Sequence, residues 1–279
     1  MKTEQVKTIT DNALTQLMSM VEQGHSETLV HYLAAMSRFH RYSFHNCMLI
    51  YTQRPTATRV AGFHGWRKLG RFVRKGEKGI LILAPMVFKT DADAIPSDSQ
   101  EPKTCLRFKA AYVFDLSQTD GDPLPCLSSV AGEPQEHLTR LKALVTANAI
   151  TLDYSEAIRP ALGCSSGGAI TLLPGLSPAQ EFSVLTHELA HEMLHQGAAR
   201  MTTTRTVREL EAEAVAFVVS QAVGLETGTA ASDYIQLYSG DKAALAASLG
   251  AIQETAVTIL RAVLDTEEAV SETIQHANV

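Results

Sequence analysis

A histidine and glutamate pattern inside the run Val184–His195 has the spacing of a metal-binding helix. A helix advances about 100° per residue, so His187 and His191 stand one turn apart on the same face, with Glu188 beside them. Two neutral imidazoles hold a cation such as Zn²⁺ without cancelling its charge, and a carboxylate beside them can accept a proton from water. The pattern predicts a metal-dependent hydrolase site, with His187 and His191 as ligands and Glu188 as the general base.

A tetrahedral catalytic site needs a third protein ligand. His195 continues the same row of the helix, but the metal must lie between His187 and His191. At about 1.5 Å per residue, His195 lies roughly 9 Å further along the axis, too far for a bond of about 2 Å. We therefore expect His195 to lie behind the ligands or to pack against them.

The next helical pattern, Val207–Phe217, supplies better donors. Glu209 and Glu213 are four residues apart and share a face, whereas Glu211 points roughly opposite. The arrangement resembles zincins whose third ligand is a glutamate from a following helix, and Glu209 comes 18 positions after His191. This resemblance implies that Glu209 is the third ligand and that Glu213 orients a ligand histidine. Glu213 as the ligand is the alternative.

The elements around this motif must position it. Ser177 and Pro178 have the residue types that begin a helix, and apolar residues at helical spacing give that helix a buried face. The strand predicted at 169–173 directly precedes it, where zincins place an edge strand that pairs with an extended peptide substrate. On a later predicted helix, Tyr234 or Tyr238 is the candidate donor to the oxyanion.

The composition of the 279 residues, 45% apolar and 19% charged, is that of a globular chain long enough for two domains. We expect an α+β fold: residues 1–118 as an α+β domain, 119–134 as a linker, and 135–279 as a mainly helical zincin-like domain with a small sheet. The amino terminus has no apolar core of a signal peptide, so we expect a cytoplasmic protein with no membrane partner. The four cysteines are scattered and predict no disulfide framework.

Periodicity and turn residues predict the individual elements. Helices are expected on both sides of Gly24, over 43–51, over 136–148 and over 241–265. Strands are expected on either side of a turn at 75–77, over 107–116 and over 150–154.

Charge is distributed unevenly along the chain. Residues 1–112 hold 16 lysines and arginines against 9 acidic residues, whereas residues 113–279 hold 8 against 21. A basic amino-terminal half beside an acidic carboxy-terminal half indicates a polyanion-binding module joined to a different one.

Between residues 32 and 82 the cations alternate with aromatic residues. Cations that neutralise phosphates, mixed with rings on which unpaired bases stack, are typical of single-stranded DNA binding. We expect Phe39, Phe44 and Phe72 to belong to the core. The predicted DNA-binding residues are Arg38, Arg41, Arg59, Trp66, Arg67, Lys68, Arg71, Arg74, Lys75 and Lys78.

The run Gly62–Ile80, together with His45-Asn46, the histidine helix, the Glu209–Glu213 run and Tyr234-Ile235, resembles the ArdC-type antirestriction proteins of conjugative plasmids and related mobile elements. The resemblance implies an amino-terminal domain that binds single-stranded DNA, a zincin-like metallopeptidase domain, and protection of incoming DNA from host restriction. It also implies His187, His191 and Glu209 as ligands of Zn²⁺ or another divalent transition metal.

Two hypotheses of different classes follow. In the first, the protein is a zinc-dependent peptidase that cuts an unknown protein substrate, such as a component of the restriction system. In the second, it is a non-catalytic single-stranded DNA shield whose metal site is structural.

Overall fold

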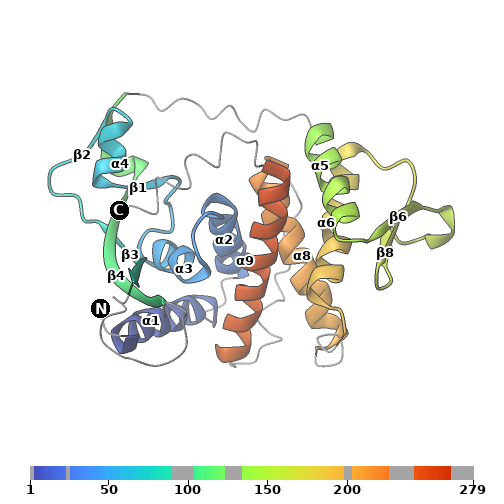
Figure 1. Cartoon of the computed structure of the whole chain (residues 1–279), viewed down its shortest axis with the longest axis horizontal. Coiled ribbons are helices and arrows are strands. Elements are labelled where there is room, and N and C mark those ends of the chain that lie inside the picture. The colour runs from blue at the N-terminus through green and yellow to red at the C-terminus, as the bar shows by residue number, and fades with distance from the viewer. Residues whose placement is uncertain are drawn as a thin grey trace.

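A computed structural model describes most of the chain and confirms an α+β fold (Figure 1). Helices make up its centre, and small sheets lie toward the two ends. The residues that the structure describes are 3–22, 26–89, 104–122, 134–197, 203–225 and 242–264.

Three helices open the chain: α1 (Thr3–Glu22), α2 (Ser26–Arg38) and α3 (Phe44–Gln53). They confirm the three helices expected in this region. The Ser43 side chain caps α3 by accepting a hydrogen bond from the backbone N–H of Asn46, as a serine N-cap does. These helices pack against one another through buried apolar side chains.

Beside the helices lies an antiparallel sheet of β1 (Val60–Gly62), β4 (Thr104–Asp115) and β3 (Ile80–Lys89), in that order. Val113 of β4 faces Ile80 of β3, and both side chains are buried. The Asn46 amide exchanges two hydrogen bonds with the Leu83 backbone, at 2.9 and 2.8 Å, which fixes α3 against the sheet.

The short helix α4 (Phe63–Lys68) and the ribbon of β2 (Arg71–Val73) with β5 (Thr119–Gly121) complete this half. The strands on either side of the 75–77 turn therefore pair with different partners and form no hairpin with each other. The predicted linker 119–134 begins inside β5, and most of its remainder lies outside the described residues. Helix α4 was not expected, because its six residues are too few to show a helical period.

The carboxy-terminal half contains α5 (Pro134–Ala147), α6 (Pro178–Leu194), α8 (Arg205–Ala222) and α9 (Lys242–Leu264). Its sheet has the order β6 (Thr151–Tyr154), β8 (Ala169–Leu172), β7 (Gly163–Ser165). The predicted edge strand is therefore wrong. Strand β8 is the central strand, parallel to β6 and antiparallel to β7, and β7 lies at the edge next to α6.

Helix α9 lies in the middle of the molecule and contacts α1 and α3 on one side and α5, α6 and α8 on the other (Figure 1). Its residues Leu249, Ile252 and Ile259 are fully buried. By length and composition, Ala243–Leu264 also resembles a membrane span, but half of its most apolar window is buried inside this core. The buried residues of both halves form one continuous cluster.

Candidate metal centre

Helix α6 places the two predicted histidine ligands. Ser177 and Gln180 cap its first turn reciprocally, and Pro178 occupies a first-turn position where a missing N–H has no cost. Phe182, Leu185 and Leu189 are fully buried and hold one face of the helix in the core. The histidines extend from another side of the same helix.

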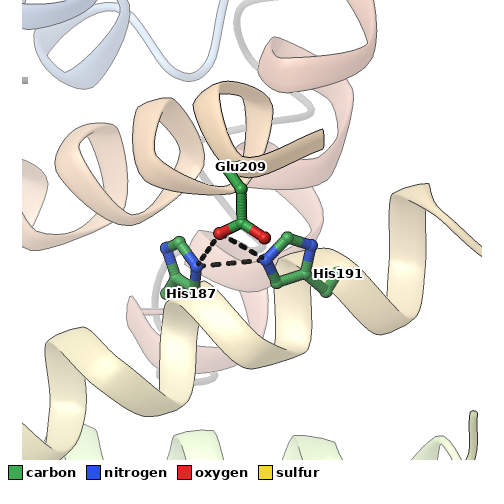
Figure 2. A group of neighbouring side chains, drawn as sticks. All are labelled: His187, His191 and Glu209. Atoms are coloured by element: carbon green, nitrogen blue, oxygen red, sulfur yellow. Dashed lines mark hydrogen bonds and ion pairs between the residues drawn. The ribbon is translucent and has the colours of Figure 1, made fainter. Parts of the chain in front are cut away.

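His187 and His191 point toward Glu209, which comes from α8 (Figure 2). The two Nε2 atoms are 3.1 Å apart, and each lies 3.6 Å from Oε2 of Glu209. Metal–ligand bonds of about 2.0–2.1 Å in a tetrahedral site place any two donor atoms about 3.3 Å apart. The three donor atoms therefore have the separations expected of groups that share one small cation.

The predicted partner carboxylate, Glu213, lies on the other side of His187. Its Oε2 is 3.4 Å from Nδ1 of His187, so this imidazole turns Nε2 toward His191 and Glu209. Burial alone would lower the pKa of His187, but its hydrogen bond to Glu213 and the surrounding carboxylates raise it. The same hydrogen bond lowers the pKa of Glu213.

His191 has a different environment, in which burial and the neighbouring charge of His187 lower its pKa to about 4. Its Nδ1 lies 3.2 Å from Nδ1 of His195, whose side chain is buried. The other nitrogen of His195, Nε2, lies 2.8 Å from Oε2 of Glu211. His195 is thus behind the predicted ligands, where the sequence placed it.

Glu211 was missed as a site residue. It lies on the opposite side of α8 from Glu209 and Glu213, as expected, but that side is the buried one. The sequence holds a signal for it: Glu211 continues the apolar stripe of Ala214, Val215 and Val218, where a carboxylate needs a buried partner. Ser248 of α9, which hydrogen-bonds Glu211, carries no such signal.

Glu188, the predicted general base, lies in the same cleft as the two histidines. Burial raises its pKa, and the Ser165 hydroxyl makes a hydrogen bond to it. Gly163 of β7 passes so close that a Cβ there would lie 2.9 Å from Oε1 of Glu188 and 2.7 Å from Val184. Strand β7 therefore forms one wall of the site, and glycine is required where that wall meets α6.

A second acidic side chain of α6 fixes the turn after β7. Glu192 is buried and accepts hydrogen bonds from the backbone N–H groups of Gly167, at 2.9 Å, and Gly168, at 2.7 Å. Glu188 and Glu192, one helical turn apart, thus hold the β7–β8 hairpin in place against α6. The cleft between α6, α8 and β7 has a volume of about 730 Å³. Tyr234 and Tyr238, the predicted oxyanion donors, lie outside the described residues.

Most of the predicted DNA-binding residues, from Arg59 to Lys78, belong to the segment that contains α4 and β2, at the opposite end of the molecule from β6 and β8 (Figure 1). Arg38 ends α2, and Arg41 follows it. Trp66 is not available for base stacking, which corrects that prediction. Its side chain is 1% exposed, and its indole N–H donates a 2.8 Å hydrogen bond to the Phe114 carbonyl. The short helix α4, which the sequence did not predict, turns the Trp66 side chain inward.

Two of the predicted arginines are engaged by the protein itself. Arg71 donates to the Thr119 hydroxyl and carbonyl, at 2.9 and 3.0 Å, and so joins β2 to β5. Arg74 pairs with Glu77 at 2.8 Å and with Asp120 at 3.5 Å. Phosphate contact by either arginine requires exchange of these partners.

The remaining predicted cations differ in exposure. Arg38 and Arg41 are exposed and Arg59 is partly buried. Four further cations are exposed and form no ion pair with another described residue: Arg67, Lys68, Lys75 and Lys78.

The core assignment of the aromatic residues holds for Phe39, which is buried, and Phe44 is partly buried against the same core. It is wrong for Phe72, which is 59% exposed because the two-stranded ribbon of β2 and β5 buries only part of its residues. Phe63 and Tyr112 are 47% and 60% exposed. Exposed rings therefore exist in this region, but they differ from the tryptophan that the sequence indicated.

Comparison with known proteins identifies the family of the amino-terminal part of the chain. Residues 3–114 match the family described as the N-terminal domain of anti-restriction factor ArdC. The crystal structure of the metal-free antirestriction protein ArdC of plasmid R388 superposes with a TM-score of 0.52, at 19% identity, over 80% of this chain and 85% of that one. Residues 3–114 therefore belong to the family of ArdC N-terminal domains, and the chain shares its overall fold with the R388 protein.

Two other relatives are informative. The Mn(II)-bound structure of the R388 ArdC protein aligns with a TM-score of 0.50, at 20% identity, over 80% of this chain and 86% of its own. An uncharacterized protein of Bacillus anthracis, pXO2-81, is 26% identical over 83% of this chain. The chain spans about half the length of this curated relative, 46%.

Proposed function

We propose that this protein is an antirestriction factor that binds single-stranded DNA and carries a metal-dependent peptidase centre. The observation that carries the proposal is the convergence of His187, His191 and Glu209 beside the buried carboxylate of Glu188. A cytoplasmic site of action follows, because incoming DNA meets restriction enzymes there.

The proposed cation is divalent, with Zn²⁺ as the first expectation from the donor set of two imidazoles and one carboxylate. Imidazole also suits other first-row metals, and Mn(II) in the R388 structure supports a site of broader selectivity. When bound, such a cation supplies Lewis acidity toward a carbonyl oxygen and toward water.

The residues of the chain supply the rest of the reaction. Glu188 accepts the proton of the attacking water, a role that its raised pKa favours because a base with a pKa nearer neutrality also returns the proton readily to the leaving amine. An extended peptide adds to the edge of β7 by main-chain hydrogen bonds, with its scissile bond beside Glu188. The β7–β8 hairpin, held by Glu192, sets the distance between that peptide and α6.

The DNA-binding part of the proposal rests on the far end of the molecule. The exposed rings of Phe63, Phe72 and Tyr112 replace Trp66 as stacking surfaces, and Arg67 and Lys68 supply charge next to them. Because α4 and β2 lie far from α6, which lines the metal cleft, DNA bound around α4 leaves that cleft open to a protein (Figure 1).

A shield without catalysis is the second candidate. The shared core favours it, since a cation that links α6 to α8 also stabilises the helices against which α2 packs. In this case the metal contributes to folding and proteolysis plays no part.

One experiment separates the two. DNA transferred into a restricting host is followed with the wild type and with Glu188→Gln, after both are shown to bind metal and single-stranded DNA equally. Loss of protection by Glu188→Gln supports the peptidase. Full protection by this variant overturns the peptidase and leaves the shield.

A further inference from the structure

A buried chain of polar side chains lies behind His191. His195 of α6, Glu211 of α8 and Ser248 of α9 are 2%, 7% and 6% exposed. His195 contacts His191 through the two Nδ1 atoms at 3.2 Å and contacts Glu211 through Nε2 at 2.8 Å. The Ser248 hydroxyl donates to the second oxygen of Glu211. Three helices thus meet at a carboxylate that touches none of the candidate metal ligands directly.

The Glu211 carboxylate determines the direction of the hydrogen bonds between these side chains. A carboxylate only accepts, so Nε2 of His195 carries the proton that Glu211 receives. A neutral imidazole has a single N–H, and Nδ1 of His195 is therefore an acceptor. Two nitrogens at 3.2 Å form a hydrogen bond only if one of them donates, so Nδ1 of His191 carries a proton.

From this geometry we infer that Glu211, acting through His195, fixes the tautomer of His191 that presents an unprotonated Nε2 to the metal. Nε2 is the atom of His191 that lies 3.1 Å from Nε2 of His187 and 3.6 Å from Glu209. Glu211 and His195 are thus positioning residues. The inference rests on the proposed metal centre, but it does not require that the centre cleaves peptides.

Helix α8 controls both histidines under this inference, by two different routes. Glu213 accepts from Nδ1 of His187 directly, whereas Glu211 reaches His191 through an interposed imidazole. Without the carboxylate of Glu211, His195 is free to donate from Nδ1 to His191. That reversal moves the proton of His191 to Nε2, where it occupies the lone pair that the metal needs.

The most direct test uses the metal-free wild type. Ring-nitrogen NMR at alkaline pH, where imidazoles are neutral, distinguishes N–H from unprotonated nitrogen at each position. The inference predicts that His191 is protonated at Nδ1 and His195 at Nε2. A metal-free protein with His191 protonated at Nε2 would overturn it, and this measurement needs no variant to fold.

A substitution at Glu211 measures how much the fixed tautomer contributes to metal affinity. Glu211→Gln keeps the shape but removes the charge, so we expect mixed tautomers at His191 and His195 and an affinity for Mn²⁺ about 10–100-fold lower. Ser220→Ala, another buried polar position of α8, is the matched control and keeps the wild-type affinity. Wild-type tautomers and affinity in Glu211→Gln would contradict the inference. A wild type that binds no metal at all would instead contradict the proposed function.

Discussion

Three acidic side chains of α8, each two positions from the next, make different contacts. Glu209 points into the candidate metal centre, Glu213 accepts a hydrogen bond from His187, and Glu211 contacts His195 in the core. Helical geometry accounts for the division, since alternate residues are turned by about 200° and residues four apart share a face. The order of residues therefore determines which carboxylate is available to a cation.

At the residue scale, a substitution at Gly163 tests whether the position of the Glu188 side chain matters, since it moves Glu188 without replacing it. Gly163→Ala would place a methyl group within 2.9 Å of the Glu188 side chain. We expect this variant to displace Glu188 and to lose the proposed peptide hydrolysis while keeping metal affinity within about threefold, because no ligand is altered. Activity assays and metal titrations on the same preparation check this, and unchanged hydrolysis would show that β7 does not constrain the base.

The pH dependence of metal binding also belongs to single residues. A ligand histidine must be neutral, and the pKa of His187 is raised above its ordinary value of 6.5, whereas that of His191 is lowered to about 4. We expect metal affinity to fall as the pH drops through the raised pKa of His187, by about tenfold per pH unit below it. Calorimetric titrations with Mn²⁺ across this range measure the effect. A loss of affinity only near the pKa of His191 would rule out His187 as the limiting ligand.

Protonation of His187 weakens metal binding, but it stabilises the fold of the metal-free protein. Because the folded pKa of His187 is raised, its contribution to the free energy of unfolding is fully present below the unfolded pKa and is lost as the pH rises through the folded one. Thermal unfolding of the metal-free protein, compared with His187→Gln, measures this contribution.

At the scale of elements, the sequence predicts the long helices well because their period, caps and apolar faces are local properties. The pairing of β2 with β5 depends on residues almost fifty positions apart, so no local pattern in the sequence predicts it. The same limit explains Trp66. An aromatic residue among cations resembles a stacking surface in sequence, but the carbonyl of Phe114 that receives its N–H belongs to β4.

The surface around α4 gives a prediction about charge. Arg67→Ala combined with Lys68→Ala is expected to weaken single-stranded DNA binding and to reduce the slope of log K against log salt by about 0.7 per lost phosphate contact. The control, Arg159→Ala with Arg261→Ala, removes the same charge from the carboxy-terminal half. An equal loss in both variants would mean that net charge matters and this surface does not.

The exposed ring of Phe72 tests stacking separately from charge. Phe72→Ala should cost about 1–3 kcal/mol of DNA-binding free energy, with an unchanged salt dependence, because a ring contributes no charge. Fluorescence anisotropy with a labelled oligonucleotide at several salt concentrations measures both quantities. Undiminished binding would place the stacking surface elsewhere.

At the scale of the whole molecule, the two halves share a core that α9 completes. The Gln253 side chain of α9 lies 3.3 Å from the Tyr42 carbonyl and 3.5 Å from the Cys47 thiol. Ser248 of the same helix hydrogen-bonds Glu211, behind the candidate metal centre. Folding of the amino-terminal half and of the carboxy-terminal half is therefore connected through one helix. The two predicted domains are expected to unfold together.

This connection gives a stability prediction. Ile252 is fully buried in α9, so Ile252→Ala should lower the free energy of unfolding by about 2–5 kcal/mol. Fluorescence of Trp66, the single tryptophan, reports the amino-terminal half, and circular dichroism reports the helices. Both signals should move to the same lower denaturant midpoint, whereas two separate transitions would show independent domains.

The central claim is that His187, His191 and Glu209 hold one divalent cation. Isothermal titration of the metal-free protein with Zn²⁺ and with Mn²⁺, for the wild type and for Glu209→Ala, tests it most directly. The structure predicts one ion per chain for the wild type and a loss of affinity of at least about 100-fold for the variant, since one of three ligands is gone. No binding by the wild type, or equal affinity in the two proteins, would contradict the claim.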